Sequence, residues 1–349
     1  MKKRNPFSLS FGMIPSKYIE RTTIKDEIVD SLTDDENPDH CFMLTGLRGS
    51  GKTVTLTKIE SIIETYEDWI VIDLNINADL LNTLVAKLYD TNQYVRDFVK
   101  SSLNLSKFGI GVNIESVAPA SDIESSLQKI LAEMKKKNKK VLACIDEASN
   151  TQSMKKFATA FQTMVRKNYP LFLIMDGLYE NISDLQNDKN LTFLYRTPKK
   201  DLGPLNITLI KATYRDTFGI SDEKAMEMAI ITKGYAFAYQ ALGRYVWEEP
   251  EHAVTETVLA KFDEAIGEYV YDKIWSELTP TEKWYLSFLI HKNSIKVSEL
   301  LEITKKKKNE FSQYHRSLAK KGVIDTSERG MVKLKLPRFE EYIKLKTLS

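Results

Sequence analysis

The chain of 349 residues contains only two cysteines, Cys41 and Cys144, and each stands in an apolar run typical of a buried strand. We therefore expect no disulfide, and predict that both thiols are small core side chains in a reducing cytoplasm. No apolar run approaches the length of a membrane span, and the residues after Met1 lack the apolar core of a signal peptide. These absences argue against a disulfide-stapled secreted domain and against a membrane protein.

Positive and negative residues nearly balance over the whole chain, but its end has an excess of positive charge. Hydrophobic residues make up 42% and charged residues 28%, as in globular proteins, and the length allows two or three domains. The net charge is only +2, yet the segment 296–340 holds 12 Lys/Arg against 6 Asp/Glu. This segment carries +6 and leaves −4 for the remainder, so the basic end requires an explanation.

A glycine-rich octet with the pattern G-x-x-x-x-G-K-[ST] lies between the apolar run 41–44 and the helix-like run 54–64. Glycines let consecutive N–H groups point at phosphate oxygens, and a helix N-terminus attracts the same charge. A glycine-rich turn that matches by chance would lack this strand and helix, so we favour a nucleoside triphosphate site. The predicted nucleotide contacts are Gly46, Leu47, Arg48, Gly49, Ser50, Gly51, Lys52, Thr53 and the following Val54.

Lys52 is expected to place its charge on the β- and γ-phosphates, and the Thr53 hydroxyl to bind Mg²⁺. The apolar run 141–145 ends in Asp146 and Glu147, which is the form of a Walker B motif. Asp146 could hold the Mg²⁺ shell, and Glu147 could orient and deprotonate the attacking water. The run 171–175 ends at Asp176, which we expect beside the γ-phosphate.

Strand-like and helix-like runs alternate up to about residue 205, which predicts an α/β core around a parallel sheet. We expect its last short strand at 206–210. The alternating run 103–117 predicts a β-hairpin or edge ribbon, either a packed insertion that covers a sheet edge or a surface for a partner.

A small helical domain and then three helical runs with a hairpin follow, an order typical of a winged helix-turn-helix. Lysines and arginines concentrate in and beside its third helix and at the hairpin turn. This favours double-stranded DNA, although a protein-docking winged helix with a solvated basic face stays open. The predicted DNA contacts are Lys306, Lys308, Gln313, Arg316, Lys320 and Arg329.

The order of these motifs resembles the origin-recognition (initiator-type) AAA+ ATPases, which share features with STAND signalling ATPases. The resemblance rests on Asn5-Pro6-Phe7 through Tyr18-Ile19-Glu20-Arg21, the octet, Leu191–Arg196 with Leu202-Gly203-Pro204-Leu205, and Gly234–Phe237 with Gln240. It implies a three-layer αβα P-loop NTPase core over 1–205, a helical lid over 206–270 and a C-terminal winged helix-turn-helix over 271–349.

The resemblance also implies roles for single residues. Tyr18, Ile19 and Arg21 would line the adenine pocket, although Glu20 replaces the family's usual glycine. Asp176 would be a sensor of the γ-phosphate. Arg196 would be an arginine finger that acts on the site of a neighbouring subunit, or else a member of an ordinary structural salt bridge.

Three functions follow from the sequence. The leading one is an ATPase switch, using ATP and Mg²⁺, whose nucleotide state controls a DNA-bound assembly of copies of this chain or a partner protein. The second is a STAND-like signalling module in which ATP gates self-association and the winged helix contacts protein. The third is a nucleotide-binding scaffold with negligible hydrolysis.

Overall fold

The computed structural model describes residues 4–10, 12–91, 95–96, 120–290, 292, 294–305 and 308–348. The chain forms two compact units. The sheet unit consists of Thr22–Thr45 and Lys52–Asp201, and the helical unit of Met1–Arg21, Gly46–Gly51 and Leu202–Ser349. The expected ribbon at 103–117 lies outside the described residues.

The sheet unit is built on five parallel strands in the order β2-β3-β4-β1-β5. Their bounds are β1 Cys41–Thr45, β2 Trp69–Leu74, β3 Lys140–Ile145, β4 Leu171–Gly177 and β5 Lys199–Asp201. Every residue of β1 and β4 is buried, because helices cover both faces of the sheet. All five strands run in the same direction, so their carboxyl ends lie at the same edge.

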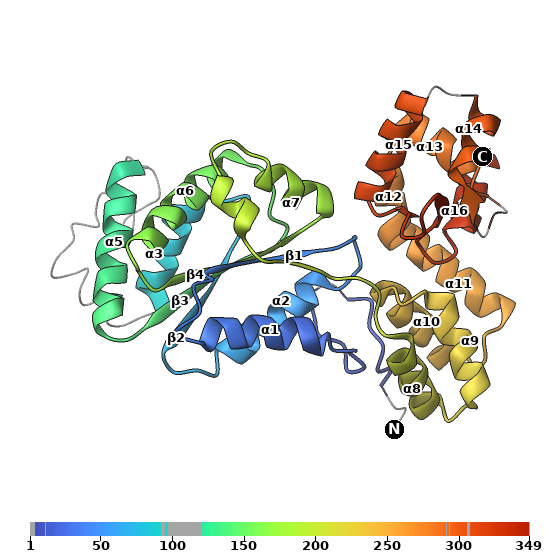
Figure 1. The fold of residues 1–349 in the computed structure, drawn as a ribbon. Helices are drawn as coiled ribbons and strands as arrows, with labels where there is room; N and C mark the ends of the chain where they lie inside the picture. The colour runs from blue at the N-terminus through green and yellow to red at the C-terminus, as the bar shows by residue number, and fades with distance from the viewer. Residues whose placement is uncertain are drawn as a thin grey trace. The chain divides into compact units, whose positions relative to one another are not determined.

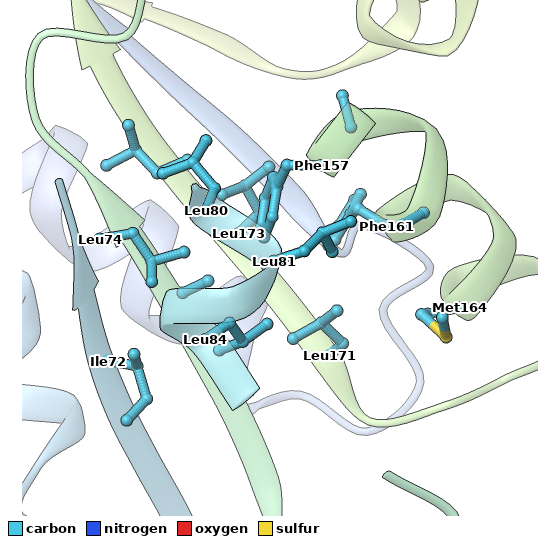
Figure 2. Close-up of a cluster of buried hydrophobic side chains, with 14 of the residues drawn as sticks. Ile72, Leu74, Leu80, Leu81, Leu84, Phe157, Phe161, Met164, Leu171 and Leu173 are labelled. Carbon is cyan, nitrogen blue, oxygen red and sulfur yellow. The ribbon is translucent and has the colours of Figure 1, made fainter. Parts of the chain in front are cut away.

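Helices cover the sheet in two layers, as Figure 1 shows. One face carries α1 Thr22–Thr33 and α2 Lys52–Ile63. The other carries α3 Leu80–Thr91, α5 Ala120–Lys136, α6 Gln152–Arg166 and α7 Tyr179–Gln186, and a 3₁₀ turn η2 Thr192–Arg196 follows them. Figure 2 shows the larger core, in which leucines of α3 meet α6 and β4; the residues include Leu80, Leu81, Leu84, Phe157, Phe161, Leu171 and Leu173. The α/β class and the three-layer core agree with the prediction.

The helical unit begins after the sheet with α8 Ile207–Phe218, α9 Asp222–Thr232, α10 Ala236–Glu248 and α11 Glu256–Ile266. A π-helical turn, η3 Gly267–Tyr271, then leads into α12 Asp272–Ser276. Phe7 from the start of the chain packs among these helices, in ring contact with Tyr214, Phe218 and Tyr239. The N-terminal segment is therefore part of this unit's core.

The described residues of the last part of the chain contain four helices and a small antiparallel sheet, β6-β8-β7. Its elements are α13 Pro280–Ser287, β6 Ile295–Lys296, α14 Val297–Thr304, α15 Lys308–Lys320, β7 Ile324–Asp325, β8 Met331–Leu334 and α16 Phe339–Leu348. The expected start of α13 is confirmed: Thr279 and Glu282 form a capping box, and Pro280 occupies the first turn.

The strand expected at 206–210 is wrong. Asn206 instead caps α8, because its side-chain oxygen accepts from the backbone N–H of Thr208 at 2.8 Å and of Leu209 at 3.3 Å. β-Branched residues favour a strand only weakly, and here the helix cap at Asn206 outweighs them. The fifth strand is β5, whose Lys-Lys-Asp sequence carries no strand signal and which pairs with β1.

Candidate nucleotide-binding site

The glycine-rich loop Gly46–Gly51 belongs to the helical unit. It closes on itself through the Ser50 N–H, which donates to the Leu47 carbonyl at 3.2 Å. The Arg21 guanidinium donates to the Ser50 carbonyl at 2.9 Å. The resemblance implies that Arg21 lines the adenine pocket. In the structure, Arg21 contacts the backbone of the glycine-rich loop.

Two further loop carbonyls are bound by the segment that precedes and begins α10. The Tyr235 hydroxyl donates to the Arg48 carbonyl, and the Phe237 N–H donates to the Gly49 carbonyl at 3.0 Å. Four consecutive carbonyls, 47 to 50, thus accept hydrogen bonds from within the protein. Only Gly234–Phe237, as a lid-like motif, hinted at this from the sequence.

Two glycines of the loop have positive φ angles, a conformation that residues with a side chain rarely adopt. Gly49 has φ +69° and Gly51 has φ +88°. A Cβ added at Gly49 would lie 2.6 Å from the Tyr235 hydroxyl, and one at Gly46 would lie 2.5 Å from Ser50 Oγ. Within the described chain, Ser50 Oγ is buried without a hydrogen-bond partner. A polar atom left in this way inside a backbone cradle suits an anion or its water.

Lys52 and Thr53 begin α2 in the sheet unit, and Val54 follows in its first turn. Thr53 Oγ1 donates to Asp146 at the end of β3, 3.2 Å from Oδ2 and 3.3 Å from Oδ1. A hydroxyl and a carboxylate held together supply the oxygen ligands that Mg²⁺ prefers. The residues present therefore fit Mg²⁺.

Asp176, at the end of β4, is completely buried. Burial, and then the charge of Asp146, raise the pKa of the Asp176 carboxyl to about 8, although the Lys52 charge opposes them. Its Oδ1 accepts weakly from the Glu147 N–H at 3.4 Å, and its Oδ2 has no hydrogen-bond partner among the described residues. Asp146, the predicted Mg²⁺ ligand, and Glu147 and Asp176, predicted for catalysis, therefore lie at the ends of β3 and β4.

Glu147 itself has an exposed side chain and a left-handed backbone, with φ +56°. A non-glycine residue in this conformation is uncommon and tends to occur where a side chain must be aimed. The adjacent Ala148 N–H donates to the Asp176 carbonyl at 2.7 Å, which fixes the turn after β3.

Tyr18 and Ile19 lie in the N-terminal segment, where Tyr18 is half-buried and Ile19 is buried. This segment is fixed to α10: the Lys17 carbonyl accepts from the Tyr239 hydroxyl and the Gln240 amide, both at 2.9 Å. Sequence reasoning did not foresee that Gln240 also accepts from the Ser8 N–H at 3.0 Å.

Arg196 lies at the exposed end of η2, beside Tyr195, whose side chain is 75% exposed. In the part of the chain that the structure describes, Arg196 forms no ion pair, so the expected structural salt bridge is not observed there.

The basic surface of the C-terminal part is only partly described. Gln313, Arg316 and Lys320 are exposed on α15, and Arg329 is exposed between β7 and β8. None of these three cations has an ion pair within the described residues. Lys306 and the side chain of Lys308 lie outside them. Lys321, which directly follows Lys320, forms an ion pair with the buried Glu282, with 2.9 Å between Lys321 Nζ and Glu282 Oε2.

Among the described residues, no helix combines the length and the apolar character needed to cross a bilayer.

Residues 268–343 match a family described as a domain of unknown function, DUF8462. No curated protein matches the sequence. Among solved structures, the chain is similar to Cdc6p from Pyrobaculum aerophilum, with 15% identity, a TM-score of 0.48 and 96% of each chain covered. It is also similar to the Aeropyrum pernix ORC1 protein in complex with DNA, with 12% identity, a TM-score of 0.47 and coverage of 95% of this chain and 94% of that one.

A STAND protein with a tetratricopeptide repeat sensor from Pyrococcus horikoshii has 14% identity and a TM-score of 0.43, covering 96% of this chain and 44% of that one. All three likenesses are distant in sequence and in structure.

Proposed function

We propose that this protein is an AAA+-type ATPase switch whose nucleotide state controls its assembly and its binding of double-stranded DNA. In this proposal the ATPase core covers 1–205, the lid 206–270 and a winged helix 271–349. The supporting observation is the loop Gly46–Gly51, in which four successive carbonyls are bound by protein donors. Backbone N–H groups, unlike carbonyls, can donate to phosphate oxygens, and the donors that bind these carbonyls restrain the loop that carries those N–H groups.

The residues after the loop have the roles that ATP hydrolysis requires. Lys52 places its charge on the β- and γ-phosphates. Thr53 and Asp146 would hold Mg²⁺, which would neutralise part of the phosphate charge. Glu147 orients the attacking water and takes its proton. Asp176, at the end of the neighbouring strand β4, is the proposed sensor of the γ-phosphate.

DNA binding is proposed for α15, with the exposed Gln313, Arg316 and Lys320 facing the duplex and Arg329 following its backbone. The local excess of positive charge supports this assignment.

The STAND-like alternative is favoured by a different observation: residues of the C-terminal part contact the phosphate loop, through Leu47 against Gly322 and Arg48 against Glu277. In this alternative the winged helix contacts protein, and ATP gates self-association. Binding of duplex DNA that weakens steeply with salt supports the first function and contradicts the alternative.

The test compares ATP binding with ATP turnover. Lys52→Ala removes a charge that contacts phosphate, so we expect roughly tenfold to a hundredfold weaker binding by titration calorimetry. Glu147→Gln keeps the shape but loses the base, so ATP should bind normally while turnover falls about a hundredfold or more. Lys58→Ala on the same helix and Glu180→Gln on α7 are the controls.

Unchanged ATP affinity in Lys52→Ala would overturn the assignment of the loop. Unchanged turnover in Glu147→Gln would remove Glu147 from the reaction. Binding without measurable turnover in the wild-type protein would favour the scaffold.

A further inference from the structure

The end of α15 packs directly against the phosphate loop. Gly322 follows α15 with φ +68°, and a Cβ added there would lie 2.3 Å from Leu47 Cδ2. Leu47 is buried, with 8% of its surface exposed. Because a side chain at position 322 would collide with Leu47, this close contact requires glycine there.

A second contact reaches the next residue of the loop. Arg48 Nη2 lies 3.0 Å from Glu277 Oε1, at the end of α12. The side-chain Nζ of Lys321, the neighbour of Gly322, donates to the Glu277 carbonyl at 3.1 Å. The Lys321 side chain thus links the residue beside Gly322 to Glu277, and so joins the two contacts.

We propose that Gly322 and Glu277 are positioning residues for the phosphate loop, so that the C-terminal part sets the ATP affinity of its own chain. The proposal rests on the proposed nucleotide binding. Tyr235 and Phe237 hold the loop carbonyls, and Gly322 and Glu277 hold the two side chains at its start. Neither positioning residue need touch the nucleotide.

The expected change in ATP affinity follows from how far the loop is ordered before ATP binds. A loop held on both its backbone and its side chains is already restrained before ATP arrives, so binding costs little conformational entropy. Displacing Leu47 or releasing Arg48 frees the loop, and ATP must then order it. Loss of either contact should therefore weaken binding. By reciprocity, whatever moves the C-terminal part away from the loop lowers ATP affinity.

The chain offers a matched control for Gly322. Gly330 has φ +75°, similar left-handed strain and the same C-terminal location, but nothing lies within 4 Å of a Cβ added there. Gly322→Ala and Gly330→Ala therefore share the backbone strain and differ in the Leu47 contact. We expect about tenfold weaker binding of a fluorescent ATP analogue by Gly322→Ala, and no change for Gly330→Ala. Circular dichroism melts establish that each variant is folded at the titration temperature.

A double variant distinguishes loss of the positioning contact from a general disturbance of the structure. Leu47→Ala shortens the side chain that Gly322→Ala would strike, so in the Leu47→Ala background Gly322→Ala should cost little further affinity. Additive losses would contradict the proposal, as would equal affinities of Gly322→Ala and Gly330→Ala.

If Gly322→Ala does not fold, a comparison of Glu277→Gln with Glu268→Gln gives the same test. Glu268 lies in η3, is exposed and has no ion pair within the described residues. Glu277→Gln should weaken binding several-fold and Glu268→Gln should not; equal affinities would overturn the proposal. Absence of ATP binding in the wild-type protein would instead overturn the proposed function, so the two failures are distinguishable.

Discussion

Glu60 on α2 is a carboxyl that the folded protein holds in its protonated form. One oxygen of Glu60, one of Asp73 on β2 and the Cys144 Sγ on β3 lie within 4.8 Å of one another. Burial, and then the hydrogen bond and charge of Asp73, raise the pKa of Glu60 to about 8. The same burial raises the pKa of the Cys144 thiol. Within the described residues, no cation forms an ion pair with either carboxyl.

The first prediction concerns stability against pH. Because the folded state binds the Glu60 proton more tightly than the unfolded chain, this group contributes stability in full below pH 4.5 and loses it as pH rises toward 8. Glu60→Gln should therefore raise the free energy of unfolding at pH 8 by on the order of 1 kcal/mol, and by nothing near pH 4.5.

Urea unfolding of the wild type, Glu60→Gln and the exposed control Glu67→Gln across this pH range measures the difference. A pH-independent difference between Glu60→Gln and wild type would contradict the pKa assignment.

Helix α15 is the element on which the DNA proposal depends. Phe311 and Leu318 are buried on one face, whereas Arg316 and Lys320, four residues apart, are exposed together on another. A helix with this division can keep its packing while its exposed charges are reversed.

The second prediction reverses those charges. Arg316→Glu/Lys320→Glu should lose duplex binding and lower the slope of log affinity against log salt by about one unit per lost phosphate contact. ATP turnover without DNA should stay unchanged. Lys224→Glu/Lys261→Glu makes the same charge change at exposed lysines of α9 and α11, and should bind duplex nearly as wild type. Equal loss in both double variants would assign the effect to net charge and contradict a DNA surface on α15.

At the scale of the whole molecule, the third prediction concerns assembly. Arg196 is exposed, and we propose that it acts on ATP bound by a neighbouring copy, because a guanidinium can stabilise charge on the γ-phosphate. Inactive Arg196→Ala mixed with inactive Glu147→Gln should then recover part of the turnover, since one site can combine an intact base with an intact arginine. Mixing each variant with itself is the control.

Light scattering with ATP, with ADP and with added duplex should accompany the mixing, because it reports the size of the oligomers. Co-purification of the two variants, each with a different tag, reports whether mixed oligomers form. Oligomers that contain both variants but recover no turnover at any ratio would contradict a role in trans.

The sequence alone predicted the features that depend on adjacent residues. The octet 46–53, the pair Asp146-Glu147 and the cap at Thr279 each work through neighbours in the chain, so their spacing carries the information. The α/β order was equally readable, since burial leaves a regular pattern of apolar residues.

Only the tertiary structure decided what holds the loop. Tyr235 binds the Arg48 carbonyl across 187 residues, and Gly322 fits against Leu47 across a still longer separation. The strand β5 and the helix at Asn206 were likewise misjudged, because pairing with β1 and a side-chain cap outweighed local propensity. Such contacts depend on how distant segments close on one another, and a pattern read along the chain does not contain that geometry.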